Sequence, residues 1–172
     1  QYAETFDGVP SNHDGKDAAI LSELAAFGKS KAWPWEAKTD WEEKLEQLVD
    51  WLDAQQDMFQ MWLGRLEARL ARYWPELLNQ LQLNSPTLLK TLVEYGSPAR
   101  LVVADETARE KLAQWGGYFL SEKKIAAILA GAKSTLGVRM GKTQVEMMQR
   151  FAQEALRARQ EVLQAKKQLK AL

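Results

Sequence analysis

The sequence predicts an all-α protein in which two long antiparallel coiled-coil arms carry a compact cap of short helices. Two long stretches, 39–74 and 139–172, repeat apolar residues at helical spacing with no proline inside them. Between them, residues 75–138 are divided by proline, glycine and serine into segments of short-helix length. No segment has the alternating, β-branched pattern that favours a strand. We therefore expect helices throughout.

Ahead of the arms, residues 1–38 are expected to contain one helix, over residues 14–27, and then a linker. Gly28 stands where a helix commonly ends. Pro34 lies in the string KSKAWPWEAK, which shows no apolar period and is typical of a linker. The apolar residues of the helix that follow helical spacing are Ala18, Leu21, Leu24 and Ala25.

The first arm is expected over residues 39–74. Thr39 stands three residues before Glu42, which is the spacing of a capping box. A helix of this length reaches about 50 Å at 1.5 Å per residue, which is too long for a small domain to enclose, so it predicts one arm of a coiled coil. Its apolar residues at heptad-like spacing are Leu45, Leu48, Leu52, Phe59, Trp62 and Leu66.

The cap, residues 75–138, is expected to hold five short helices. Their strings are WPELLNQLQL, SPTLLKTLVEYG, SPARLVVA, DETAREKLAQWGG and EKKIAAILAGAKSTLG, the last with Ser121 as its cap. Proline suits the first helical turn, serine and aspartate suit N-caps, and glycine suits helix ends. The residues assigned to these positions are Pro75, Pro86 and Pro98, then Ser85, Ser97 and Asp105, then Gly96 and Gly116.

The second arm is expected over residues 139–172. Alanines on its seam allow close approach of a neighbour, and the bulky side chains of the first arm complement them, so we expect the arms to pack antiparallel. Leu156 and Leu163 widen the apolar stripe, which predicts contact with a second neighbour. One heptad register passes through Met148, Phe151, Ala155, Ala158, Val162, Ala165, Leu169 and Leu172.

Composition excludes several classes of protein. The chain has no cysteine, which excludes a disulfide framework and thiolate zinc sites. Its one histidine, His13, is interpreted as a polar loop residue, and no phosphate-binding loop motif is present. No apolar run approaches the roughly 20 residues of a membrane span. We expect a cytoplasmic protein without membrane contact.

Charge is unevenly distributed although the net charge is zero. Residues 1–60 carry 5 Lys/Arg and 13 Asp/Glu, whereas residues 139–172 carry 8 and 3. Basic surface can bind nucleic acid, but a charge excess of this size also fits a solvated helix face. Charge alone favours the solvated face.

Asp14 and Asp17 raise the question of a metal site. Side chains at i and i+3 share a helix face, so both carboxylates can reach one divalent cation such as Mg²⁺. From spacing alone, however, aspartates at a helix start are more typical of capping and of interaction with the helix dipole. The residues by themselves leave both interpretations open.

A wider pattern resembles a known family, the insertion-sequence transposases with a RuvC-like DEDD catalytic domain, which include the Piv-type site-specific invertases. The resemblance covers about residues 12 to 172. It is carried, in this order, by HDGKDAAILSELAAFGKSKAW, LEARLARYWPELL, LNSPTLLKTLVEYGSP, GGYFLSEKKIAAIL and AKSTLGV.

The resemblance implies a catalytic and structural role for each part. Residues 1–38 would be the C-terminal end of an RNase H-like catalytic domain, with Asp14 and Asp17 as the last two of four acids that hold Mg²⁺. The coiled coil would pair two protomers, and the whole enzyme would act on DNA, in some members with a structured guide RNA. His13 departs from the residue usual before the first of these aspartates. Since at most two of the four acids are here, we expect this chain alone to cleave nothing.

The leading hypothesis is therefore the dimerising, nucleic-acid-binding central part of a DNA transposase or site-specific recombinase. The main alternative is a structural helical adaptor that binds partner helices and no nucleic acid. A third, weaker hypothesis is a stand-alone phosphate-processing enzyme centred on Asp14 and Asp17. The basic residues predicted to contact nucleic acid are Arg65, Arg69, Arg72, Arg139, Lys142, Arg150, Arg157 and Lys166.

Overall fold

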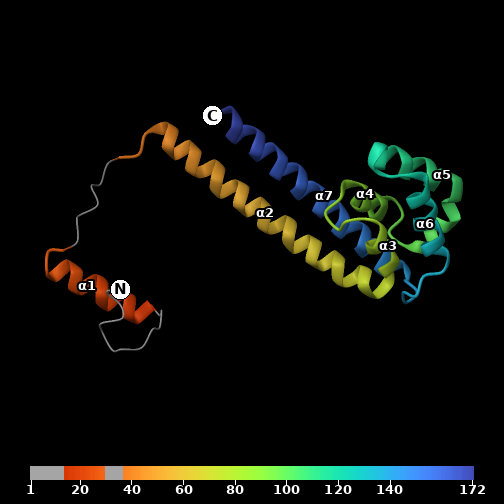
Figure 1. Cartoon of the computed structure of the whole chain (residues 1–172), viewed down its shortest axis with the longest axis horizontal. Helices are drawn as coiled ribbons and strands as arrows, with labels where there is room; N and C mark the ends of the chain where they lie inside the picture. Colours follow the sequence, from red (N-terminus) through yellow and green to blue (C-terminus); the bar gives the residue numbers. More distant parts are fainter. Residues whose placement is uncertain (1–13, 30–36) are drawn as a thin grey trace. The chain divides into compact units, whose positions relative to one another are not determined.

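The structure, a computed structural model, describes residues 14–29 and 37–172, with side chains in the first range from residue 18 onward. Within these residues it contains seven α-helices, one 3-10 turn and no strand (Figure 1), which confirms the all-α prediction. The chain divides after Thr39 into two units, and each is treated by itself. No helix in the described ranges is long and apolar enough to cross a bilayer.

The first unit contains helix α1, Asp14–Ala26. The helix ends in a Schellman motif, as Gly28 predicts: this residue has φ 64°, a left-handed conformation that glycine adopts without steric cost. The Lys29 amide donates to the Leu24 carbonyl at 2.9 Å, and the Gly28 amide donates to the Ala25 carbonyl at 3.1 Å. These bonds satisfy carbonyls that the helix itself leaves unpaired.

The second unit is built on two long helices, α2 (Asp40–Tyr73) and α7 (Lys142–Ala171). They pack antiparallel along most of their length, so the start of α2 and the end of α7 lie at one end of this hairpin (Figure 1). The cap lies at the other end, where α2 ends and α7 begins. The predicted pair of antiparallel arms is confirmed.

A narrow seam of small side chains on α7 lets the two helices approach closely. Its buried residues are Val145, Met148, Ala152, Ala155, Ala158, Val162 and Ala165, and those of α2 are Gln55, Leu63, Leu66 and Leu70. Four of the seven on α7 are alanines, opposite a helix whose buried side chains are larger, as the sequence predicts. Burial of each leucine stabilises the fold by about 2 kcal/mol.

The seam departs from one straight heptad register at the capped end. Ala152 is buried, whereas Phe151 is only half-buried. The reason is that α4 packs on a second side of α7, where the Gln149 side-chain amide donates to the Val93 carbonyl at 2.9 Å. The contact of α7 with α4 as well as with α2 gives it the second neighbour that the sequence predicts. Leu156 packs against the core, whereas Leu163 is exposed.

The cap consists of α3 (Pro75–Gln80), α4 (Pro86–Glu94), α5 (Pro98–Gly116), the 3-10 turn η2 (Gly117–Phe119) and α6 (Glu122–Lys133). Prolines begin α3, α4 and α5, as predicted. The Ser85 hydroxyl accepts from the Leu88 amide at 3.2 Å, and the Ser97 hydroxyl accepts from the Arg100 amide at 3.3 Å. Both serines are therefore N-caps, whereas Ser121 precedes α6 without a side-chain cap bond.

One cap segment breaks where the sequence predicts, and another ends earlier than expected. We expect two helices between residues 97 and 117, and α5 indeed consists of two helical segments joined by a kink at Asp105, whose φ is 36°. The predicted helix break therefore lies at the residue assigned to it. The helix expected to run to Gly137 ends instead at Lys133.

The loop between α6 and α7 is held in place by backbone contacts with the end of α2. The Val138 amide donates to the Arg72 carbonyl at 3.0 Å. Gly137 lies against the same turn, and a Cβ atom built on it would stand 2.1 Å from the Tyr73 carbonyl oxygen. Only glycine allows this approach, because the obstructing atom belongs to the backbone.

Gly137→Ala is expected to destabilise the protein by about 3 kcal/mol, because a methyl group would force the loop away from α2. The matched control is Gly64→Ala in the middle of α2, where an added Cβ meets nothing within 4 Å. That change is expected to stabilise by about 0.5–1 kcal/mol through helix propensity. Urea denaturation of both variants measures the two effects, and changes of the same sign would contradict the packing.

Candidate nucleic-acid interface

Asp14 and Asp17 both lie in α1, one helical turn apart. Their side chains and all of His13 are outside the described residues. Among the described residues, no three or more His, Cys, Asp or Glu side chains gather to hold a metal ion. The described part of the chain therefore does not complete a magnesium site, and the assignment of these two aspartates stays a prediction.

Three of the predicted arginines form a row on α2. Arg65, Arg69 and Arg72 are four and three residues apart, so they share one helix face. They line one hollow of about 460 Å³, together with Ala68, Tyr73 and Phe151 of α7. We call these three residues the arginine row. It occupies about 10 Å of helix axis, over which one DNA strand carries about three phosphates.

Aromatic rings lie beneath the guanidinium groups of the arginine row. The Arg65 Cζ atom is 5.0 Å from the Trp62 ring centre, and the Arg69 Cζ atom is 4.9 Å from that of Phe151. Arg72 lies over Tyr73 at 5.4 Å. Such contacts contribute about 0.5–1 kcal/mol each at exposed sites. They restrict the guanidinium planes while leaving N–H groups available to an anion.

The arginine row has no acidic partner in the described part of the chain. None of its members lies within 4.0 Å of a described carboxylate, whereas Arg109, Lys111, Lys133 and Lys142 all do. Arg65 and Arg72 are exposed and Arg69 is half-buried. Charged groups presented in this way can bind phosphate without first breaking an ion pair.

The remaining predicted contacts on α7 are not part of the arginine row. Arg150 is adjacent to Phe151 but lines a different hollow, with Glu146, Gln149 and Gln153. Arg157 and Lys166 are exposed and lie about 9 Å and about 22 Å beyond Phe151 along the helix axis. They occupy the half of α7 that runs beside the acidic half of α2.

Arg139 and Lys142 belong to a separate cluster near the cap. They line a hollow of about 700 Å³ with two further cations, Arg100 of α5 and Lys133 of α6. The sequence predicted the first two only. Arg100 and Lys133 were missed because they are remote in sequence and carry no local motif. Phe151 was likewise assigned to the seam, although it also supports two arginines of the row.

The half-buried carboxylate of Glu76, in α3, positions the loop that carries Arg139. It accepts from the Thr135 hydroxyl and from the Leu136 amide, each at 2.7 Å. Partial burial raises the pKa of Glu76. The two hydrogen bonds and a third from its own backbone amide lower this pKa, and together they outweigh the effect of burial. The pKa of this carboxyl therefore lies below its ordinary value of 4.5.

Comparisons of the chain with protein-family models, with curated protein sequences and with solved structures each give no match. The second unit presents two separate groups of cations, the arginine row and the cluster near the cap. Both groups suit recognition of phosphate.

The lowered pKa of Glu76 predicts a pH-dependent part of the stability. Because the folded-state pKa is below the unfolded one, this contribution is present above about pH 4.5 and is lost as the pH falls through the folded value. The free energy of unfolding of the natural protein should fall more steeply between about pH 5 and about pH 3 than that of Glu76→Gln. Urea denaturation across this range measures both slopes, and equal slopes would contradict the assigned hydrogen bonds.

Proposed function

We propose that this chain is a dimerising, nucleic-acid-binding scaffold from a DNA transposase or site-specific recombinase. Its ligand would be DNA or a structured RNA, bound through phosphates. The single observation that carries the nucleic-acid part is the arginine row, which lies over aromatic rings and has no carboxylate partner among the described residues. The recombinase context rests on the sequence resemblance, and Mg²⁺ would belong to the catalytic domain it implies.

Phosphate contact through the arginine row is supported by the form of its surroundings. The row borders a hollow at the capped end of the hairpin, which Phe151 of α7 also lines. A guanidinium stacked on a ring can still donate two parallel hydrogen bonds to a phosphate. Contacts of this kind bind the backbone rather than the bases, so we expect affinity with little sequence preference.

The other end of the hairpin supports pairing with a second copy of this chain. Before Leu63, α2 buries only Gln55, and it exposes the apolar side chains of Trp51, Met58 and Met61. Residues 40–57 carry seven Asp/Glu and one Lys, whereas residues 157–170 of α7 carry five Lys/Arg and one Glu. Two hairpin ends packed antiparallel would place each acidic stretch against the basic stretch of the other copy, and would cover the exposed apolar groups.

The helical adaptor remains the alternative. The dependence of binding affinity on salt concentration distinguishes it from a nucleic-acid-binding scaffold. Phosphate contacts release counterions, so the logarithm of affinity falls with the logarithm of salt concentration by about 0.9 per contact. An adaptor that binds partner helices through apolar faces would keep its affinity at high salt. Absence of salt-sensitive binding to both DNA and structured RNA would favour the adaptor.

Replacing the arginine row with glutamine at all three positions is expected to reduce the salt dependence by about 3 on the logarithmic slope, because three phosphate contacts are lost. Fluorescence anisotropy with duplex DNA and with a structured RNA, across a sodium chloride series, measures the slope. The control removes three exposed cations elsewhere, by Lys90→Gln, Lys123→Gln and Lys124→Gln. If the control lowers the slope equally, binding is diffuse and the arginine row is not the site.

Met58→Glu is expected to weaken self-association by about 2 kcal/mol, or about thirtyfold, because it would bury an unpaired charge between two copies. Sedimentation equilibrium gives the dissociation constant. Val103→Glu is the control, since it places the same charge on an exposed apolar position of α5. A natural protein that stays monomeric at high micromolar concentration, or an equal loss in both variants, would exclude this interface.

A further inference from the structure

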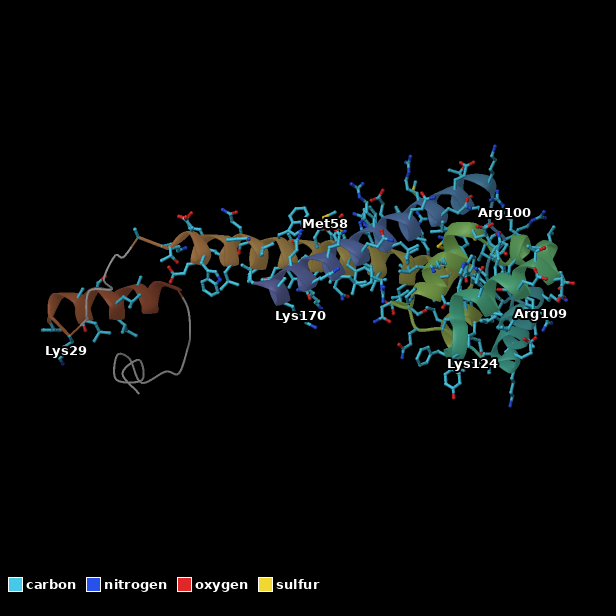
Figure 2. All side chains as sticks on the ribbon, turned by 90° about the horizontal axis from the view of Figure 1, so that it is seen from above. Lys29, Met58, Arg100, Arg109, Lys124 and Lys170 are labelled. Carbon is cyan, nitrogen blue, oxygen red and sulfur yellow. The ribbon has the colours of Figure 1, made fainter. Side chains whose placement is uncertain are left out.

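The hollow near the cap gathers positive charge from four segments of the chain. Arg100 comes from α5, Lys133 from α6, Arg139 from the loop after it, and Lys142 from the first turn of α7. Arg100, labelled in Figure 2, lies on the cap. The hollow measures about 700 Å³, a size in the range of small-molecule sites. We call these four residues the cap cluster.

The charge of the cap cluster is poorly balanced. Among the described residues that line the hollow there is no Asp or Glu. Lys133 and Lys142 do have carboxylates nearby, Asp105 and Glu146, but each at 3.9 Å and with both side chains more than half exposed. Ion pairs of this length in water contribute little. Arg139 has no carboxylate within 4.0 Å in the described ranges.

The fold holds these like charges together although their mutual repulsion is unfavourable. Arg100 donates to the Gln149 side-chain oxygen at 3.4 Å, a long hydrogen bond at an exposed position. The loop that carries Arg139 is fixed by the hydrogen bonds to Glu76 and by the close approach of Gly137 to α2. An anion in the hollow would relieve the repulsion, and two arginines and two lysines offer it both forked and single donors.

Two other features of the hollow suit an anion that carries a less polar body. Lys142 begins a helix of 30 residues whose N-cap, Gly141, has no side-chain hydrogen bond, so the first amides of α7 add partial positive charge. The wall also contains apolar groups, from Val102, Met140 and Val145. A ligand with an anionic end and a less polar body would use both surfaces.

We propose that the cap cluster is a second phosphate site, which takes the phosphate or diphosphate of a nucleotide-sized group. That group is either a free ligand or the 5′ end of a nucleic-acid strand, because both present the same oxyanion. The site is distinct from the arginine row. It therefore goes beyond the proposed function, and it can be present even if the arginine row binds no nucleic acid.

The test is titration of the full chain with inorganic pyrophosphate, with binding measured by isothermal titration calorimetry. The natural protein should bind it with saturation, and Arg139→Gln with Lys142→Gln should weaken binding at least tenfold. Two controls keep the result specific: Lys123→Gln with Lys124→Gln removes the same charge elsewhere on α6, and the triple glutamine variant of the arginine row leaves the cap cluster intact. Both should bind pyrophosphate as the natural protein does.

A second measurement distinguishes the two sources of the phosphate. Single-stranded oligonucleotides with a 5′-phosphate and with a 5′-hydroxyl are compared for affinity, with pyrophosphate as competitor. If the 5′-phosphorylated strand binds with higher affinity and pyrophosphate displaces it, the ligand is the strand end. If both strands bind with equal affinity while pyrophosphate binding saturates, the ligand is a free phosphate compound. The proposal is overturned if pyrophosphate does not bind at millimolar concentration and the 5′-phosphate has no effect, or if the α6 control weakens binding as much as the cap-cluster variant.

Discussion

The packing of a small-residue helix against a large-residue helix is the constraint on which the second unit depends. Ala152, Ala155 and Ala158 leave room for the leucines of α2, and this close approach fixes how the two long helices face one another. Because α7 is held in this way, its other side is available to α4, and the cap is thereby attached to the hairpin. The positions of the basic side chains follow from the same packing.

The helices of the cap share the hydrophobic core, whereas the loop between α6 and α7 is held by a few local contacts. Glu76 and Gly137 come from segments about sixty residues apart, and together they hold the loop after α6 against the end of α2. This loop carries Arg139 of the cap cluster and contacts the end of α2 at Arg72, the last member of the arginine row. The hydrophobic core gives the unit its stability, whereas this small junction positions the loop that carries Arg139.

The sequence specifies the helices well because their boundary signals are local. Proline in the first turn, serine caps and the glycine after α1 each act within four residues, and the structure places them as expected. The predicted end of α6 was wrong, because the Leu136 amide donates to the Glu76 carboxylate, which is distant in sequence, instead of continuing the helix. The arginine row could be recognised from one helix face, but the cap cluster could not, since tertiary packing assembles it from four segments.

The antiparallel hairpin also has a mechanical consequence. Since α2 begins and α7 ends at the same end, the cap is carried on a stalk whose length both helices set together. Removing seven residues from each helix would shorten the stalk by about 10 Å while turning the cap by only about 20°. Removing seven from one helix alone would break the alanine seam. The distance between the cap and the other end of the hairpin can therefore change during evolution by equal deletions or insertions in both helices, while the packing of the cap stays the same.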